Sequence, residues 1–87
     1  MVVFGGFSEG YRNNQVYRLN LQSNTWEHLL TKGEPPCPRT GHSAVIYENY
    51  MIIFGGKNDE NEKVNDVWLL DFKDNSWNQV IYKAGDI

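Results

Sequence analysis

Residues 1–6 read MVVFGG and residues 51–56 read MIIFGG, so the chain carries nearly the same six residues twice, 50 positions apart. The match continues downstream, where VYRLNLQSNTW (16–26) aligns with VWLLDFKDNSW (67–77) at an offset of 51. The change of offset falls between these stretches, in polar residues typical of a surface loop. The 87-residue chain is therefore built from a repeated structural unit.

The complete unit predicts four short β-strands, over residues 40–47, 50–54, 66–72 and 76–80. Valine, isoleucine and aromatic residues dominate these runs, as strands prefer, and no apolar run with helical spacing reaches about ten residues. Glu48-Asn49 is expected to form a tight turn, in which asparagine suits a left-handed backbone better than glutamate does. The predicted fold class is all-β.

The strands also differ in polarity. MIIF (51–54) and VWLLDF (67–72) are almost continuously apolar, which predicts a sheet that is buried on both faces. The last strand, SWNQV (76–80), mixes polar and apolar residues and predicts a wetter outer edge. A small sheet of this kind suits one blade of a β-propeller, in which four-stranded sheets are arranged radially around a channel.

These residues resemble the kelch repeat. The matching features are an apolar strand ending in Gly-Gly and a tryptophan downstream, Trp26 and Trp77, found in both units. The segment PRTGHSAV (38–45) resembles the first strand of such repeats, whereas leucines at 19 and 70 stand where many kelch repeats have tyrosine. The resemblance covers almost the whole chain. It implies a kelch-type β-propeller segment of about one and three-quarter four-stranded antiparallel blades.

The resemblance also implies a division of the chain. Residues 1–30 would form strands two to four of a partial blade, 31–38 an inter-blade linker, 39–80 a complete blade, and 81–87 the start of the next linker. Repeat units do not bury their faces alone, and about three are usually needed for stability. We therefore expect a fragment of a longer protein, or a chain that completes its ring by self-association.

Bulk properties exclude several classes. The formal charge of −3 with interspersed signs lacks the basic stripe of a nucleic-acid binder. The longest apolar runs span about four residues, far short of the roughly 20 needed to cross a membrane. Cys37 is the only cysteine, so it forms no internal disulfide, and it suits a reducing, cytoplasmic compartment.

No catalytic site, metal site or cofactor is predicted. The two histidines have no companions with metal-ligand spacing, and we expect a structural role for His42 and a surface position for His28. Ser43 lies in GHSA, which is not a G-x-S-x-G nucleophile elbow, and Cys37 lies between two prolines without a helix N-terminus to activate it. The glycine pairs lack phosphate-binding spacing and are interpreted as structural.

The resemblance assigns partner-binding roles to five residues. Kelch propellers that capture peptides use an arginine at the start of strand one, here Arg39, and polar residues where strand three begins, here Asn14, Gln15, Asn65 and Asp66. Arginine would favour an acidic peptide, because guanidinium pairs with carboxylate in a bidentate way. The alternative is that Arg39 ties neighbouring blades together through backbone carbonyls.

The sequence therefore predicts a non-catalytic protein-interaction or scaffold module with a protein or peptide ligand, whose loops 7–15 and 57–66 determine specificity. A different class remains open, because galactose oxidase also has a kelch-like propeller and binds copper through tyrosine and histidine. The two histidines here do not reproduce that site. The alternative is thus a segment of a kelch-propeller enzyme, galactose-oxidase-like or a small-molecule lyase or isomerase, with its active site elsewhere.

Overall fold

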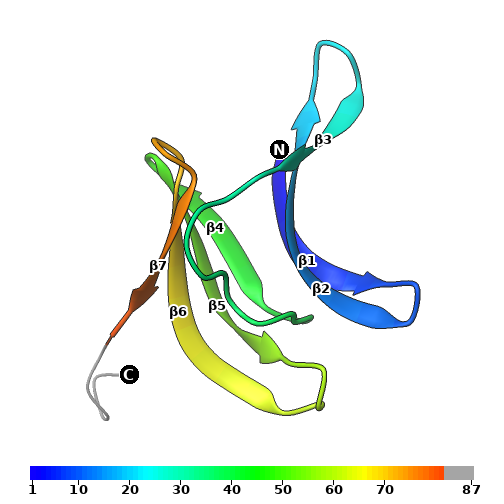
Figure 1. The fold of residues 1–87 in the computed structure, drawn as a ribbon, viewed down its shortest axis with the longest axis vertical. Coiled ribbons are helices and arrows are strands. Elements are labelled where there is room, and N and C mark those ends of the chain that lie inside the picture. Colours follow the sequence, from blue (N-terminus) through cyan, green and yellow to red (C-terminus); the bar gives the residue numbers. More distant parts are fainter. Residues whose placement is uncertain (82–87) are drawn as a thin grey trace.

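The computed structural model describes residues 1–81, which form two antiparallel sheets that lie side by side as successive blades (Figure 1). The first sheet has the order β1 (Val2–Ser8), β2 (Tyr11–Asn20), β3 (Thr25–Leu29). The second has the order β4 (Ser43–Tyr47), β5 (Tyr50–Lys57), β6 (Lys63–Asp71), β7 (Ser76–Val80). The predicted fold class is confirmed. The linker predicted to start at 81 lies, apart from Ile81, outside the described residues.

The second and third strands of the second sheet, β5 and β6, are longer than predicted. β5 continues to Lys57 and β6 already begins at Lys63, because the two strands go on pairing beyond the glycine pair. β7 occupies the predicted range, 76–80. The glycine pair therefore does not end the strand, as the sequence comparison suggested, but lies inside it.

The turn between β4 and β5 reverses the expected roles of its two residues. Glu48 has a positive φ of 52°, whereas Asn49 does not. Asn24 lies in the β2–β3 turn, and its repeat counterpart Asn75 lies in the β6–β7 turn. Both adopt positive φ, at 55° and 57°. The position within the turn thus decides which residue is left-handed, and glutamate accepts the conformation where the turn demands it.

Each glycine pair produces a β-bulge, with a register shift between Phe4 and Gly6 in the first sheet and between Phe54 and Gly56 in the second. All glycines of the two pairs have positive φ, which costs glycine little and other residues much. The bulge bends both strands at the same place in each blade. The repeated sequence therefore encodes a repeated bend.

The two glycines of a pair make room for different neighbours. A Cβ atom added at Gly5 would lie 3.1 Å from the carbonyl oxygen of Arg39, which belongs to the next blade. A Cβ atom at Gly56 would lie 2.7 Å from the carbonyl oxygen of Thr40, which pairs with β5 of its own blade. The absence of a Cβ atom at Gly5 thus lets the neighbouring blade approach β1. Its absence at Gly56 lets the residues before β4 approach β5 within the same blade.

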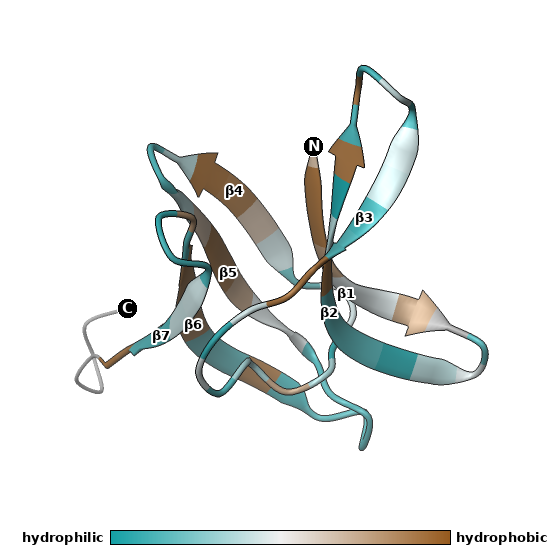
Figure 2. Ribbon diagram, turned by 45° about the horizontal axis from the view of Figure 1, so that its top comes forward, coloured by the Kyte–Doolittle hydropathy of each residue, from teal (hydrophilic) through white to brown (hydrophobic). Residues whose placement is uncertain are grey.

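The core lies between the two sheets. Phe4, 2% exposed, packs edge to face on Trp77, with ring centroids 5.2 Å apart. Hydrophobic residues are concentrated along β4, β5 and the upper part of β6, and the hairpin tips are mostly polar (Figure 2). The buried hydrophobic residues of the described chain come from both sheets and are Phe4, Val16, Met51, Ile53, Leu70 and Trp77.

Burial is one-sided, which differs from the sequence prediction of burial on both faces. The face of β5 that carries Met51 and Ile53 is buried against the first sheet, but Phe54 on the opposite face is 41% exposed. β7 is an edge strand that mixes buried Trp77 with exposed residues, as predicted, but β4 at the other edge is more exposed still, over all five of its residues. Within residues 1–81 the first sheet has three strands, one fewer than the second, and all of β4 is left exposed.

Substitution of the second glycine in each pair separates backbone strain from steric contact. Gly6 and Gly56 have nearly the same φ, 110° and 106°, but an added Cβ meets nothing within 4 Å at Gly6. We expect Gly6→Ala to cost about 1–2 kcal/mol in free energy of unfolding, the strain of a left-handed backbone. Gly56→Ala should cost clearly more, because its Cβ overlaps the Thr40 carbonyl. Urea denaturation measures both, and equal costs would contradict the steric explanation.

Candidate functional site

Residues 36–42, called the connecting segment below, lie between the two sheets and bond to the first through the backbone. The amide of Arg39 donates to the carbonyl oxygen of Asn13 at 3.3 Å, and the amide of Gly6 donates to the carbonyl oxygen of Arg39 at 3.0 Å. These two bonds join the connecting segment to the bulge of the neighbouring blade. The backbone of the segment is therefore held across the blade boundary.

Two side chains of β2 reinforce this contact. The amide nitrogen of Asn14 donates to the carbonyl oxygen of Pro36 at 3.1 Å, and Nε of Arg12 donates to the hydroxyl of Thr40 at 2.9 Å. Pro36 lacks a backbone N–H, so its carbonyl oxygen is the backbone group through which it can form a hydrogen bond. Asn14, predicted to bind a partner, is thus used to hold the blades together.

The side chain of Arg39 turns the other way, into the second sheet, where none of it is exposed. Nη1 and Nη2 donate to the two oxygens of Asp66 at 2.6 and 2.8 Å, and Nη1 also donates to the carbonyl oxygen of Gly55 at 3.1 Å. Nε donates to the carbonyl oxygen of Cys37, and Trp68 donates to Asp66 at 2.8 Å. The guanidinium and its carboxylate form one connected network.

The network shifts the pKa values of both charged groups. The hydrogen bond from Arg39 holds the pKa of Asp66 below its ordinary value, against the opposing effect of burial. Burial disfavours the charged guanidinium, but the hydrogen bond and charge of Asp66 outweigh it, so the pKa of Arg39 is raised. Both groups therefore stay ionised at neutral pH.

The five residues predicted to bind a partner are thus divided by the structure. Arg39, Asp66 and Asn14 are engaged in contacts within and between the blades. Arg39 bonds to the neighbouring blade through its backbone, whereas its guanidinium bonds within its own blade. Gln15 and Asn65 are exposed where β2 and β6 approach the boundary. The partner-binding role of all five stays a prediction.

His42 packs within the blade boundary, and His28 lies on the surface. The His42 ring contacts Phe4 edge to face, with centroids 5.3 Å apart, and its Nδ1 is buried without a hydrogen-bond partner within residues 1–81. Burial lowers the pKa of His42 and the Arg39 charge lowers it further, while the backbone of Phe4 acts in the opposite direction. His28 is exposed and stacks on Tyr17. Both positions agree with the sequence prediction.

The hairpin tips of β1–β2 and β5–β6 lie at the same end of the molecule, here called the hairpin end (Figure 1). The backbone amide of Arg12 donates to Asp59 at 3.3 Å and so joins the two hairpins. Phe7 and Tyr11 are the most exposed aromatic residues of this end. The loop 7–15 was predicted from the sequence to determine specificity, but without these rings, although exposed aromatics in a polar hairpin are a signal of binding.

Within the described residues, no three His, Cys, Asp or Glu side chains converge as metal ligands would. The same part of the chain contains no helix that is long and apolar enough to span a membrane. Cys37 is a free, exposed cysteine.

Comparisons with known proteins agree with the geometry. The KLHDC2/KLHL20/DRC7 Kelch-repeats domain matches residues 1–86. The chain is 42% identical over 80 residues to Rho GTPase-activating protein gacHH of Dictyostelium discoideum, covering 88% of this chain and 5% of that protein. It is 34% identical over 96 residues to F-box/kelch-repeat protein At1g51550 of Arabidopsis thaliana, covering 100% and 20%. Host cell factor 1 of Homo sapiens is 35% identical over 89 residues, covering 87% and 4%. The chain thus spans a small part of each of these relatives.

Removal of the Asp66 charge tests the network. Asp66→Asn leaves the buried guanidinium without its counter-ion, and we expect a loss of about 3 kcal/mol in free energy of unfolding. Glu27→Gln is the matched control, because it removes the charge of an ion pair with Arg18, 2.8 Å apart, in which both side chains are largely exposed. Chemical denaturation compares the two, and an equally small loss in both variants would show that the network is not structural.

The lowered pKa of His42 predicts a pH dependence. Below pH 6.5 the unfolded chain takes up a proton that the folded ring accepts only at lower pH, so stability should fall until the folded-state pKa is passed. Asp66 adds its own loss only below pH 3.8. Melting temperatures between pH 8 and pH 5 should fall less in His42→Gln than in the unchanged chain. His28→Gln is the control and should retain the full fall.

Proposed function

The chain belongs to the kelch-repeat family, and from that premise we propose that it is a protein-interaction module whose recognition face is the hairpin end. The observation that carries this proposal is the exposure of Phe7 and Tyr11 in the β1–β2 hairpin, which the Arg12 amide joins to Asp59 of the β5–β6 loop. Phe7 pairs with Arg12 and Tyr11 with Ser8, so the two rings lie on opposite faces of the paired hairpin, which holds both backbones in a regular register. Rigid aromatic side chains are typical anchors of protein interfaces.

The charge at this end favours a basic partner. Exposed acidic side chains outnumber exposed lysines in the two hairpins: Glu9, Asp59, Glu60 and Glu62 against Lys57 and Lys63. Aromatic faces attract Lys and Arg through cation–π interaction, and the carboxylates add electrostatic attraction. We propose a protein segment rich in Lys or Arg as the ligand. The acidic ligand suggested by Arg39 is less well supported, because that side chain is buried.

The module is proposed to be non-catalytic and cytoplasmic. The ionisable groups at the blade boundary, Arg39 and Asp66, are engaged with each other rather than directed at an open site, which supports a structural use of their charges. The free thiol of Cys37 suits a reducing compartment. Recognition would then depend on the loops and not on the repeated strands.

Selection of a random displayed peptide library on the immobilised chain tests the recognition face. We expect the enriched peptides to be rich in Lys and Arg, and Tyr11→Ser to weaken their binding about tenfold, the contribution of an aromatic contact to a cation. Tyr47→Ser is the control, since Tyr47 is also exposed but lies at the β4–β5 turn, away from the hairpin end. Enrichment of acidic peptides, or equal binding to both variants, would contradict the proposal.

A further inference from the structure

β4 is an edge strand whose side chains are open to solvent. It lies at one end of the second sheet, with β5 as its one strand partner within residues 1–81. Val45, Ile46 and Tyr47 are 56%, 57% and 62% exposed, and they follow one another in the sequence. Since consecutive residues of a strand point to opposite faces of its sheet, this edge exposes apolar surface on both faces.

The other sheet edges within residues 1–81 carry features that discourage pairing with another chain. β1 is bent by the bulge at its glycine pair, and β3 carries the charged Glu27 next to exposed His28. The edge of β7 is occupied at Ser76 by a parallel bridge from Lys32. β4 has none of these features, because its sequence SAVIY contains no charge, glycine or proline and its register with β5 is continuous.

The turn that follows β4 determines which of its backbone groups face the open edge. Tyr47 pairs with Tyr50 across a two-residue turn, and in such a hairpin the two flanking residues bond to each other. The direction of the N–H and C=O groups alternates along an antiparallel strand, so Val45 also directs its groups at β5. Ala44 and Ile46 therefore direct their N–H and C=O groups at the open edge.

One antiparallel register lets two copies of β4 satisfy these groups in each other. A pair of strands centred on Val45 places Ala44 of each copy opposite Ile46 of the other copy. These are the residues whose backbones face the edge, so both such pairs can exchange their N–H···O=C bonds. A register shifted by one residue would set edge-facing groups against groups that already point at β5, and these bonds would be lost.

The side chains agree with the same register. Val45 would face its own counterpart at a non-hydrogen-bonded position, where side chains lie closest and pairs of β-branched residues stabilise a sheet. Glu48, the charged residue that follows the strand, would fall opposite position 42 of the other copy. The two copies of Glu48 would then lie at opposite ends of the pair, so the net charge of −3 per chain is not concentrated at the contact.

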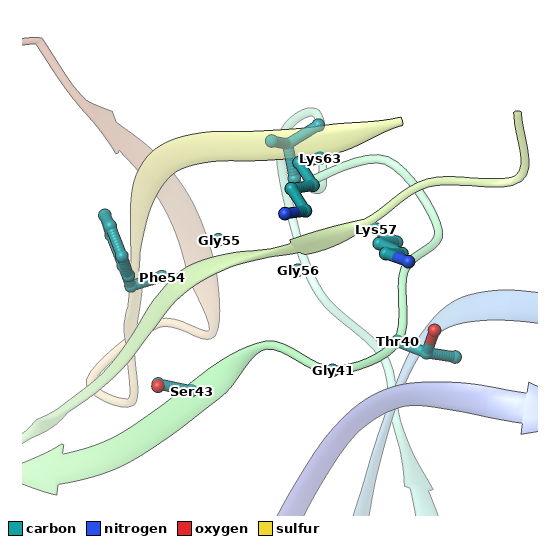
Figure 3. A pocket seen from close by; sticks show the side chains of 9 residues that line it. Thr40, Gly41, Ser43, Phe54, Gly55, Gly56, Lys57 and Lys63 are labelled. Carbon is teal, nitrogen blue, oxygen red and sulfur yellow. The ribbon is translucent and has the colours of Figure 1, made fainter. Parts of the chain in front are cut away.

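We propose that the edge of β4 is a self-association surface, at which two copies of the chain pair antiparallel around Val45 and join their four-stranded sheets into one. The contact is two-fold symmetric and uses the edge of both copies, so assembly stops at the dimer. Ser43 begins the strand at a cavity of about 390 Å³ that Phe54 also lines (Figure 3), and this cavity takes no part in the pairing. The surface is also separate from the hairpin end.

Disulfide trapping tests the register directly. Val45→Cys, made together with Cys37→Ser so that one thiol remains, would place two Cα atoms about 4.5 Å apart, a distance that a disulfide spans. Tyr47→Cys in the same background is the matched control, since Tyr47 is equally exposed but would lie more than about 13 Å from its counterpart. Under mild oxidation we expect Val45→Cys to form the covalent dimer at least about tenfold faster. Equal rates overturn the proposal.

Charge substitution at the same position gives a second measurement. A five-residue edge makes a small interface, so we expect the unchanged chain to dimerise in sedimentation experiments only near about 1 mM. Val45→Lys and Val45→Glu each set like charges opposite each other and should stay monomeric, whereas an equimolar mixture of the two should dimerise. Because Val45 is exposed, neither variant should change the melting temperature of the dilute chain. Monomeric behaviour of the unchanged chain or of the mixture overturns the proposal.

Phe54→Ser separates edge pairing from contact through the outer face. Phe54 is 41% exposed, but it lies in β5, inside the sheet, and we expect its substitution to leave dimerisation unchanged. Hydrogen exchange at the amides of Ala44 and Ile46 should slow about twofold at the concentration where half of the chains are paired, and stay unchanged at Val45. Loss of the dimer in Phe54→Ser, or assembly beyond the dimer, overturns the proposal.

Discussion

A buried guanidinium needs a counter-charge and hydrogen-bond acceptors for its N–H groups inside the protein. For Arg39, Asp66 supplies the charge, and Asp66 and the carbonyl of Gly55 supply acceptors. The backbone of the same residue bonds to Asn13 and Gly6 of the preceding blade. One residue therefore fixes the start of its own blade and the distance of that blade from its neighbour. The packing of the core between the sheets and the position of both hairpin tips follow from this arrangement.

The glycine pairs leave room for the backbone of Arg39 and Thr40. The connecting segment can approach closely only where the facing strand has no Cβ atom. Gly5 faces the segment from the neighbouring blade, and Gly56 faces it from the segment's own blade. The aromatic contact of Phe4 with Trp77 then fills the space beside the bulge. In the first unit this site is occupied by the connecting segment, through the bonds of Gly6 and Asn13 to Arg39.

Much of the fold followed from the sequence, because the repeat offset and the apolar runs specify which strands are equivalent and how they pair. The bulge did not, since pairing beyond Gly56 depends on φ values that the sequence does not reveal. For the candidate site, the resemblance named Arg39 and Asp66 among five partner-binding residues but did not predict that they bind each other. The exposure of Phe7 also required the structure, because Phe4, the same residue type in the same strand, is buried.

By itself the sequence determined the family, the all-β fold and the equivalence of the two units, because these depend on residue types at fixed spacing. The tertiary structure decided how each equivalent residue is used. Phe4 and Phe54 have the same residue type and the same place in the repeat, yet one is buried and the other exposed. Burial depends on which surface lies opposite, and only the folded arrangement of the two sheets supplies that surface.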